Sequence, residues 1–168
     1  IMYVGFIFVG TYMGYAVGSA PVISYHYGAG NKDELKNLFK RSLTIIIVSS
    51  VVMTLIAEII AGYLAGIFVS YDNNLLELTT EAIRIYAVSY LISGVNIFAS
   101  SFFTALNNGV VSAVISFMRM FVFQIVMILL LPVVLGISGI WTAVIAAEVL
   151  SVVISVMFLV KNRKKYSY

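Results

Sequence analysis

The sequence contains no cysteine and only one histidine, and each shortage excludes a class of chemistry. Without cysteine, these 168 residues offer no disulfide, no thiol nucleophile and no cysteine-ligated metal. With His26 alone, the paired-histidine metal motifs are also excluded. No nucleophile is paired with a base, and the phosphate-binding pattern G-x-x-x-x-G-K-[ST] does not occur. We therefore expect a protein that is not an enzyme and that binds no cofactor.

Charged residues are scarce as well, and this scarcity indicates the environment in which the chain folds. Charged residues make up 10% of the sequence and hydrophobic residues 62%, with a mean hydropathy of +1.07. Such a chain has too little polar surface to solvate a water-soluble domain of this size. We expect membrane lipid as its surroundings. We expect no nucleic acid as a partner, because the net charge of +3 comes from two short basic clusters without interleaved aromatic platforms.

Long apolar runs predict the fold class. A helix that crosses a hydrocarbon layer of about 30 Å needs about 20 apolar residues, whereas barrel strands are about 10 residues of alternating polarity. The runs here are long and do not alternate, so the sequence predicts an all-α membrane protein with five transmembrane helices. Their expected ranges are 1–25, 42–69, 79–105, 110–134 and 138–160. Residues 31–41, with Asn31 as N-cap, are expected to form a separate amphipathic helix on the membrane surface, with Leu35, Leu38 and Phe39 turned to lipid.

The basic residues predict one orientation. Lysine and arginine cluster in the loop 28–41 and again after residue 160, and such clusters stay on the cytoplasmic side of a plasma membrane. Both clusters can be cytoplasmic together only if the chain starts outside the cell. We therefore expect the sequence to be the carboxy-terminal part of a longer protein.

Small residues and a proline mark the first run. Gly10, Gly14 and Gly18 recur at every fourth position, which predicts a face on which another helix packs closely. Pro21 predicts a kink or a break near the cytoplasmic end of the helix. Two interpretations stay open: ordinary static packing, or a hinge formed by Gly14, Gly18 and Pro21 that opens and closes a cavity.

Glu58, Arg119 and Glu148 are expected near the bilayer midplane. A charge at this depth costs about 2.5–3.5 kcal/mol on insertion scales, so each side chain should face the protein interior or a wet cavity. Arg119 and Glu148 lie at similar depth on consecutive antiparallel helices and are the predicted pair, either as a structural ion pair or as part of a transport pathway. Glu58 is then the surplus carboxylate, bonded to Ser50 or Thr54 on its own face or binding a proton or cation.

A polar stripe runs along the third span. Its members recur at spacings of three or four, and we expect them to line a water-accessible cavity, with plain helix contacts as the alternative. The stripe consists of Ser89, Ser93, Asn96, Ser100 and Thr104, and shorter stripes contain Ser112 and Ser116 on the fourth span and Trp141, Ser151 and Ser155 on the fifth. The candidate pathway residues are therefore Glu58, Ser93, Asn96, Ser100, Arg119 and Glu148.

Several motifs together resemble the multidrug and toxic compound extrusion (MATE) family. The segment 21–31, Pro-Val-Ile-Ser-Tyr-His-Tyr-Gly-Ala-Gly-Asn, resembles the family's proline-to-glycine motif. Further matches are Ser116-Phe-Met-Arg119, Leu131-Pro132, Gly136-Ile-Ser-Gly-Ile-Trp141-Thr-Ala and Ala147-Glu148, most similar to the MepA-like branch. The resemblance implies a twelve-helix, two-lobe fold of the MOP superfamily, in which this chain supplies helices eight to twelve and an N-terminal lobe is missing.

The same resemblance implies a function. MATE proteins export cationic, often aromatic, small molecules in exchange for H⁺ or Na⁺, by rocking one lobe against the other around a midplane site. Members that bind sodium in the second lobe use acidic residues on helices seven and ten, and here the tenth offers Ser93 and Asn96 without a carboxylate. The coupling ion thus stays open between H⁺ and Na⁺. The alternatives are a lipid-linked saccharide flippase of the same superfamily and a non-transporting structural membrane protein.

Overall fold

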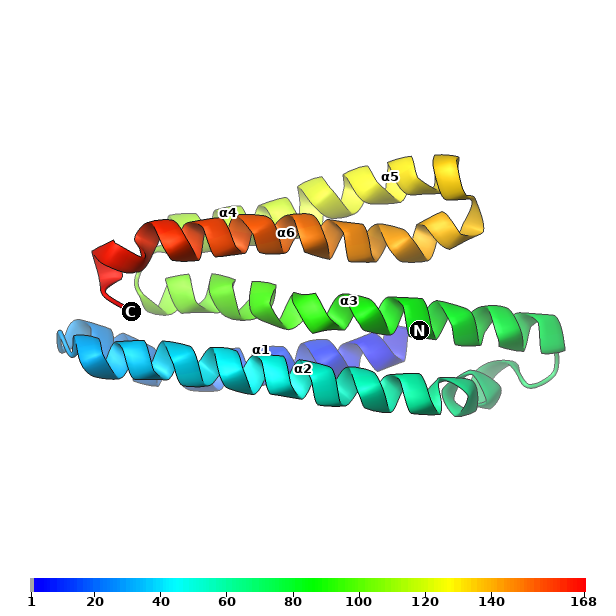
Figure 1. Ribbon diagram of the computed structural model, residues 1–168, viewed down its shortest axis with the longest axis horizontal. Coiled ribbons are helices and arrows are strands. Elements are labelled where there is room, and N and C mark those ends of the chain that lie inside the picture. Colours follow the sequence, from blue (N-terminus) through cyan, green and yellow to red (C-terminus); the bar gives the residue numbers. More distant parts are fainter. Residues whose placement is uncertain (1) are drawn as a thin grey trace.

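The computed structural model describes residues 2–168, so Ile1, at the start of the first expected span, lies outside the described residues. Five helical rods, each long and apolar enough to cross a membrane, run back and forth along one axis (Figure 1). They are α1 (Met2–Gly28), α2 (Lys32–Val69), α3 (Asn73–Ala105), the composite of α4 (Gly109–Phe117), η1 (Met118–Phe123) and α5 (Gln124–Leu135), and α6 (Ile137–Tyr166). The expected all-α membrane fold is confirmed.

Helix α3 occupies the centre of the molecule. The pair α1 and α2 packs on one side of it, and α4 and α6 pack on the other (Figure 1). The largest buried side chains of α3 are Phe98, Phe102 and Phe103, which meet Tyr12 of α1 and Ile46 of α2 in one apolar cluster. Because both layers pack against α3, the polar side chains of this helix lie between them.

Short loops end the helices with the expected turn chemistry. The Asn31 side chain accepts a hydrogen bond from the Glu34 amide at 3.2 Å, which confirms Asn31 as the N-cap of α2. Asp72 caps α3 by accepting from two amides, at 2.9 and 3.2 Å. Gly30 and Gly136 occupy the turns at φ +69° and +61°, in the left-handed region that glycine adopts without strain.

The segment 31–41 differs from its expected structure. It forms the first turns of α2 and continues into the membrane-spanning part without interruption. Leu35 is 1% exposed. The ring centroid of Phe39 lies 4.9 Å from that of Phe102 and 4.7 Å from that of Tyr168. The prediction of a separate surface helix was wrong because the apolar face of this segment finds aromatic partners on α3 and at the carboxy-terminal end.

The glycine face of α1 also differs from its expected role. Gly10, Gly14 and Gly18 are exposed, and a Cβ added to any of them would meet nothing within 4 Å in the described chain. Close approach instead occurs at other glycines. At Gly94 of α3 an added Cβ would lie 2.9–3.2 Å from side chains of α1 and α2, at Gly5 it would meet the Tyr90 hydroxyl, and at Gly139 of α6 it would meet the backbone of Leu131. Helix α1 continues through Pro21, so the helix is not broken there. A hinge at Gly14, Gly18 and Pro21 stays a prediction.

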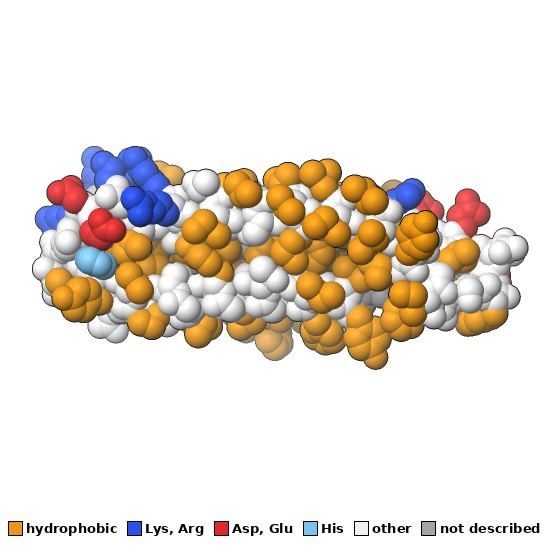
Figure 2. All heavy atoms as spheres, turned by 90° about the horizontal axis from the view of Figure 1, so that it is seen from below, with side chains coloured by type: hydrophobic (Ala, Val, Ile, Leu, Met, Phe, Trp, Pro, Cys, Tyr) orange, Lys and Arg blue, Asp and Glu red, His pale blue; other side chains and the backbone are white. Residues whose placement is uncertain are grey.

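The exterior is divided into an apolar middle and polar ends. Figure 2 shows hydrophobic side chains along the middle of one face, with lysine and arginine gathered at one end. Several large apolar side chains are highly exposed, among them Val133 at 84% and Tyr63 at 83%. Such a surface is stable against hydrocarbon and costly against water. It therefore fits a lipid environment.

Candidate functional site

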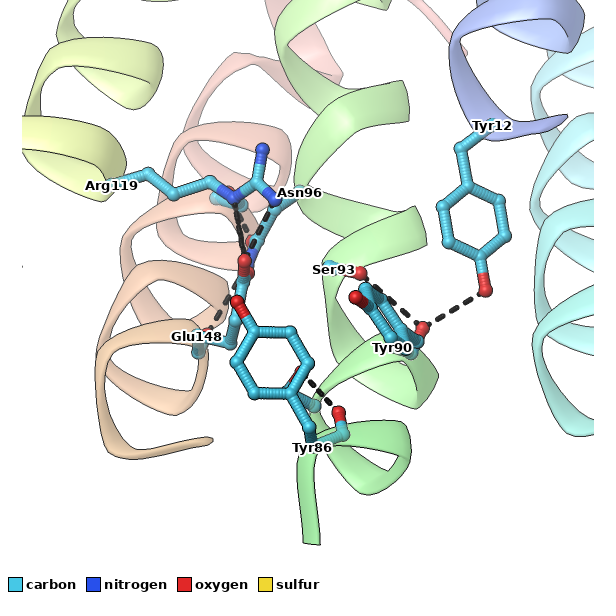
Figure 3. Close-up of polar contacts among 9 residues, drawn as sticks. Tyr12, Tyr86, Tyr90, Ser93, Asn96, Arg119 and Glu148 are labelled. Atoms are coloured by element: carbon cyan, nitrogen blue, oxygen red, sulfur yellow. Dashed lines mark hydrogen bonds and ion pairs between the residues drawn. The ribbon is translucent and has the colours of Figure 1, made fainter. Parts of the chain in front are cut away.

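Arg119 and Glu148 form an ion pair in the interior, between η1 and α6 (Figure 3). Arg119 Nη2 lies 2.7 Å from Glu148 Oε1, and Nε donates to Oε1 at 2.9 Å and to Oε2 at 3.1 Å. The Glu148 side chain is 8% exposed and the Arg119 side chain 19%. The predicted pairing is confirmed. Since two nitrogens of the guanidinium engage the carboxylate, the geometry is directional as well as electrostatic.

Asn96 connects this pair to the central helix. Its Nδ2 donates to Glu148 Oε2 at 2.7 Å and to the Glu148 carbonyl oxygen at 3.2 Å, and its Oδ1 accepts from the Ser155 hydroxyl at 2.8 Å. Asn96 and Ser155 are both fully buried. A buried amide with its donors and its acceptor engaged fixes the carboxylate in position and joins α3 to α6.

Arg119 lies in η1, a π-helical stretch of six residues between α4 and α5. A π turn closes with i→i+5 hydrogen bonds, is rare, and occurs often at functional sites of membrane and soluble proteins. No residue of η1 is fully buried. The sequence contained no signal for this feature, because its residues are ordinary apolar helix residues apart from Arg119.

Three cavities follow one another beside the ion pair. The first, about 380 Å³, is lined by Arg119 and Glu148 together with Gln124. The second, about 440 Å³, shares Arg119 with the first and extends along Asn96 and Ser100. The third, about 720 Å³, shares Gln124 with the first and extends toward the end of the bundle at which α3 begins. Arg119 thus lies where the first and second cavities of this row adjoin, and Gln124 where the first and third adjoin.

The polar stripe of α3 lies beside this row of cavities. Its members Ser93, Asn96 and Ser100 have different surroundings. Ser93 is buried and donates weakly, at 3.4 Å, to the Tyr90 carbonyl oxygen. Ser100 lies within hydrogen-bond distance of the Ser112 and Ser116 hydroxyls, at 2.9 and 2.7 Å. Ser93 lines the first cavity and Ser100 the second, and Asn96 both lines the second cavity and bonds to α6. Both expected uses of the stripe, cavity lining and helix contact, therefore occur.

Two tyrosines of α3, Tyr86 and Tyr90, complete the wall of the first cavity, and the sequence analysis did not single them out. The Tyr86 hydroxyl points toward the Glu148 carboxylate in Figure 3, and Tyr86 lines both the first and the third cavity. Tyr90 stacks on Phe8 with centroids 4.2 Å apart, and its carbonyl oxygen accepts from the Tyr12 hydroxyl at 3.0 Å. Their spacing of four residues on α3, next to Ser89 and Ser93, is the signal that could have revealed them.

Glu58 does not join this site. Its carboxylate lies 3.9 Å from Arg84 Nε on α3, and the two side chains are 34% and 57% exposed. Its expected partners bond elsewhere, since Ser50 donates to the Ile46 carbonyl oxygen and Thr54 to that of Ala87. The prediction of Glu58 as a surplus carboxylate was wrong, because it left Arg84 out of the count of intramembrane charges.

The charged groups of this site are one carboxylate, that of Glu148, and one guanidinium, that of Arg119. Within residues 2–168 there is no group of three His, Cys, Asp or Glu side chains that could hold a metal ion. The Glu148 carboxylate lines the first cavity and is neutralised by Arg119. A desolvated pair of this kind is sensitive to any competing charge, because its interaction is screened less than that of a surface pair.

Comparison with known proteins agrees with this architecture. The family model MatE matches residues 1–130. The structure is similar to that of the Vibrio cholerae MATE transporter VcmN in its bent form, with a TM-score of 0.86 and 17% sequence identity, a likeness that shows the fold alone. The match covers 96% of this chain and 36% of that chain, and no curated protein matches the sequence significantly. Because the family model spans most of the sequence and the fold is that of a MATE transporter, the chain belongs to the MATE family of membrane transporters.

Proposed function

We propose that this chain is part of a multidrug efflux pump that exports cationic, often aromatic, small molecules by antiport with H⁺ or Na⁺. The observation that supports it most is the Arg119–Glu148 pair, in which Glu148 is buried and Arg119 partly buried, hydrogen-bonded to Asn96 and bordered by cavities. An ion pair inside a membrane is costly to bury, and such pairs commonly belong to ion or substrate pathways. The proposal extends the family assignment to a substrate class and an energy source.

Competition for Glu148 is the mechanism that we infer. A proton or sodium ion that reaches the carboxylate through the first cavity would weaken its bonds to Arg119 Nε and Nη2. Arg119 would then turn toward the second cavity, whose wall it already shares. A cationic substrate can act on the same carboxylate, and the two cations would exclude one another because a single carboxylate serves both. Exclusive binding of this kind couples the two fluxes.

Aromatic side chains support the choice of substrate. Tyr86 and Tyr90 border the first cavity, and Tyr3, Phe68 and Trp141 border the third. Aromatic faces attract cations and stack on planar molecules, with cation–π contacts worth about 0.5–2 kcal/mol each. A planar organic cation would therefore find aromatic rings in the first and third cavities and the Glu148 carboxylate in the first.

Transport further requires access from alternate sides. We propose that an N-terminal lobe, absent from this sequence, faces the row of cavities, and that rocking of the two lobes exposes Glu148 first to one side and then to the other. We place the transporter in the plasma membrane with the basic end of the bundle in the cytoplasm, since lysine and arginine favour that side.

Substitution of Glu148 tests the proposal. The full-length transporter carrying Glu148→Gln would be reconstituted in vesicles, and uptake of ethidium would be followed under an imposed proton or sodium gradient. We expect at least a tenfold loss of gradient-driven transport. The matched control is Glu81→Gln, which removes an exposed carboxylate at the start of α3 and should stay within twofold of the unsubstituted protein. Gradient-driven transport that is unchanged in Glu148→Gln would refute the proposal.

The flippase alternative is less well supported. A pyrophosphate-linked saccharide needs a basic groove, and Arg119 is the sole lysine or arginine that lines the three cavities beside the pair. Its charge is already neutralised by Glu148. The row of cavities is therefore better suited to a cation than to an anion.

A further inference from the structure

A fourth cavity lies apart from this row, on the other side of α3. It has a volume of about 390 Å³ and is bordered by α2, α3 and α6 near the end of the bundle where α6 ends. We call it the α2–α6 crevice, lined by Lys36, Phe39, Lys40, Leu43, Ile47, Val95, Val156, Leu159, Val160, Arg163 and Tyr168. Helices α2 and α6 each pack on α3, and the crevice separates them.

Its two side walls change from apolar to basic in the same direction. On α2, Leu43 and Ile47 are followed toward the end of the bundle by Lys40 and Lys36, at spacings of three or four that keep them on one helix face. On α6, Val156 and Val160 are followed in the same direction by Arg163. Three cations therefore border the mouth of a crevice whose inner walls are hydrocarbon.

No aspartate or glutamate side chain of the described chain forms an ion pair with these cations. The ion pairs among residues 2–168 are Glu58–Arg84 and Arg119–Glu148, both elsewhere. Arg163 Nε donates to the Tyr168 carbonyl oxygen at 3.3 Å, and its other two nitrogens make no hydrogen bond to residues 2–168. The nearest carboxylates along α2, Asp33 and Glu34, do not reach Lys36 or Lys40 within ion-pair distance. Three cations without a carboxylate side-chain partner in the described chain thus border one crevice.

The crevice is bounded by well-fixed side chains. Tyr168 packs on Phe39 and Phe102, and its hydroxyl donates to the Leu159 carbonyl oxygen at 2.8 Å. Burial raises the pKa of the Tyr168 phenol above its ordinary value, so that this group stays a neutral donor. Because Tyr168 and Leu159 are nearly fully buried, the inner wall of the crevice is preformed.

We propose that the α2–α6 crevice binds one anionic phospholipid. The phosphate of the head group would lie between Lys36, Lys40 and Arg163, and an acyl chain would run along Ile47 and Val156 toward the middle of the bundle. These two apolar residues are 49% and 46% exposed, so the crevice is open to the hydrocarbon that surrounds the protein. This inference goes beyond the proposed transport and does not depend on the transported substrate.

Charge and place together favour this occupant. Basic side chains at the end of a membrane helix attract anionic lipid head groups, and guanidinium binds phosphate through paired hydrogen bonds. A zwitterionic lipid brings its own cation, which would lie against three others. A volume of about 390 Å³ also falls within the range of roughly 300–1,000 Å³ that small-molecule sites occupy.

A charge-matched pair of variants gives the first test. The full-length transporter would be purified in detergent and titrated with dioleoylphosphatidylglycerol or dioleoylphosphatidylcholine. Native mass spectrometry would count the bound lipid molecules. We expect phosphatidylglycerol to bind and Lys36→Gln/Lys40→Gln to weaken it at least tenfold, since each basic residue near an anionic head group contributes about fivefold. The control Lys32→Gln/Arg41→Gln removes the same charge from α2 outside the crevice and should change binding less than threefold.

A second pair tests the apolar part of the crevice. Val156→Trp should fill it and abolish specific binding of phosphatidylglycerol, whereas Val153→Trp, at an exposed position of the same helix outside the crevice, should not. Titration with glycerol 3-phosphate separates a lipid site from a site for free phosphate, and we expect no binding. Equal losses in both members of either pair, equal binding of the two lipids, or binding of glycerol 3-phosphate as tight as that of the lipid would each overturn the proposal.

Discussion

Leucine substitution of Arg119 and Glu148, singly and together, measures how strongly the interior depends on their pairing. Glu148→Leu leaves the Arg119 guanidinium without an acceptor among residues 2–168, because all of its hydrogen bonds end on that carboxylate. Its insertion cost of about 3 kcal/mol is then uncompensated. Arg119→Leu is less severe, because Asn96 Nδ2 still donates to Glu148 at 2.7 Å. We expect that variant to lose about 2 kcal/mol, a typical cost for a partly satisfied buried group.

The double variant should be more stable than the two single losses imply. With both charges removed, no unpaired charge remains in the interior. Apolar replacement of a buried ion pair often changes the free energy of unfolding little. Asn96 loses its side-chain acceptor but keeps the Glu148 carbonyl oxygen, at 3.2 Å. We therefore expect a total loss of about 2 kcal/mol, with a coupling energy of about 3 kcal/mol between the two positions.

Reversible unfolding in mixed micelles, followed by circular dichroism, supplies the four free energies of unfolding. Size-exclusion profiles at low denaturant would establish that each variant starts from the same folded state. Losses that add to within about 0.5 kcal/mol would refute the reasoning, because independent sites behave in that way. A larger loss for Arg119→Leu than for Glu148→Leu would refute the role assigned to Asn96.

Three further predictions concern packing, capping and access. Gly94→Leu should lower the free energy of unfolding by about 3 kcal/mol in the same unfolding assay, because its new side chain must displace α1 and α2, whereas Gly14→Leu should change it by less than about 0.5 kcal/mol. Asp72→Ala should remove about 1 kcal/mol from the start of α3, seen as faster amide exchange in the first turn, and unchanged exchange would contradict the cap. Ser116→Cys, beside the second cavity, should react with a water-soluble maleimide and Ser155→Cys, fully buried, should not; equal labelling would contradict the geometry.

Much of the fold was predictable because a membrane imposes simple rules. Apolar runs longer than about 20 residues can be satisfied in lipid only as helices, so the number of spans followed from length alone. The Arg119–Glu148 pair was predictable for a related reason. Two opposite charges at equal depth on consecutive helices are each too costly to leave alone, and the structure brings them within 2.7 Å.

Other features depend on packing that the sequence does not encode locally. Repeated glycine on α1 suggested close contact, yet the close approaches are at isolated glycines, Gly5 of α1, Gly94 of α3 and Gly139 of α6. Small residues permit helix contact without specifying which helix arrives, so their pattern alone could not locate it. The segment 31–41 was equally ambiguous, because an amphipathic face can be satisfied by lipid or by aromatic rings, and Phe102 and Tyr168 are far from it in sequence.

The π-helical stretch changes which residues of the fourth rod face the same way. Arg119 and Gln124 line one cavity although they are five residues apart. In a regular α-helix a step of five residues turns about 500°, which would leave Gln124 about 140° away from the face of Arg119. The wider turn absorbs one residue and restores the alignment. Deleting one residue between them would therefore rotate the whole of α5 about its own axis. The one extra residue of the π turn thus determines which side chains of α5 face the cavities.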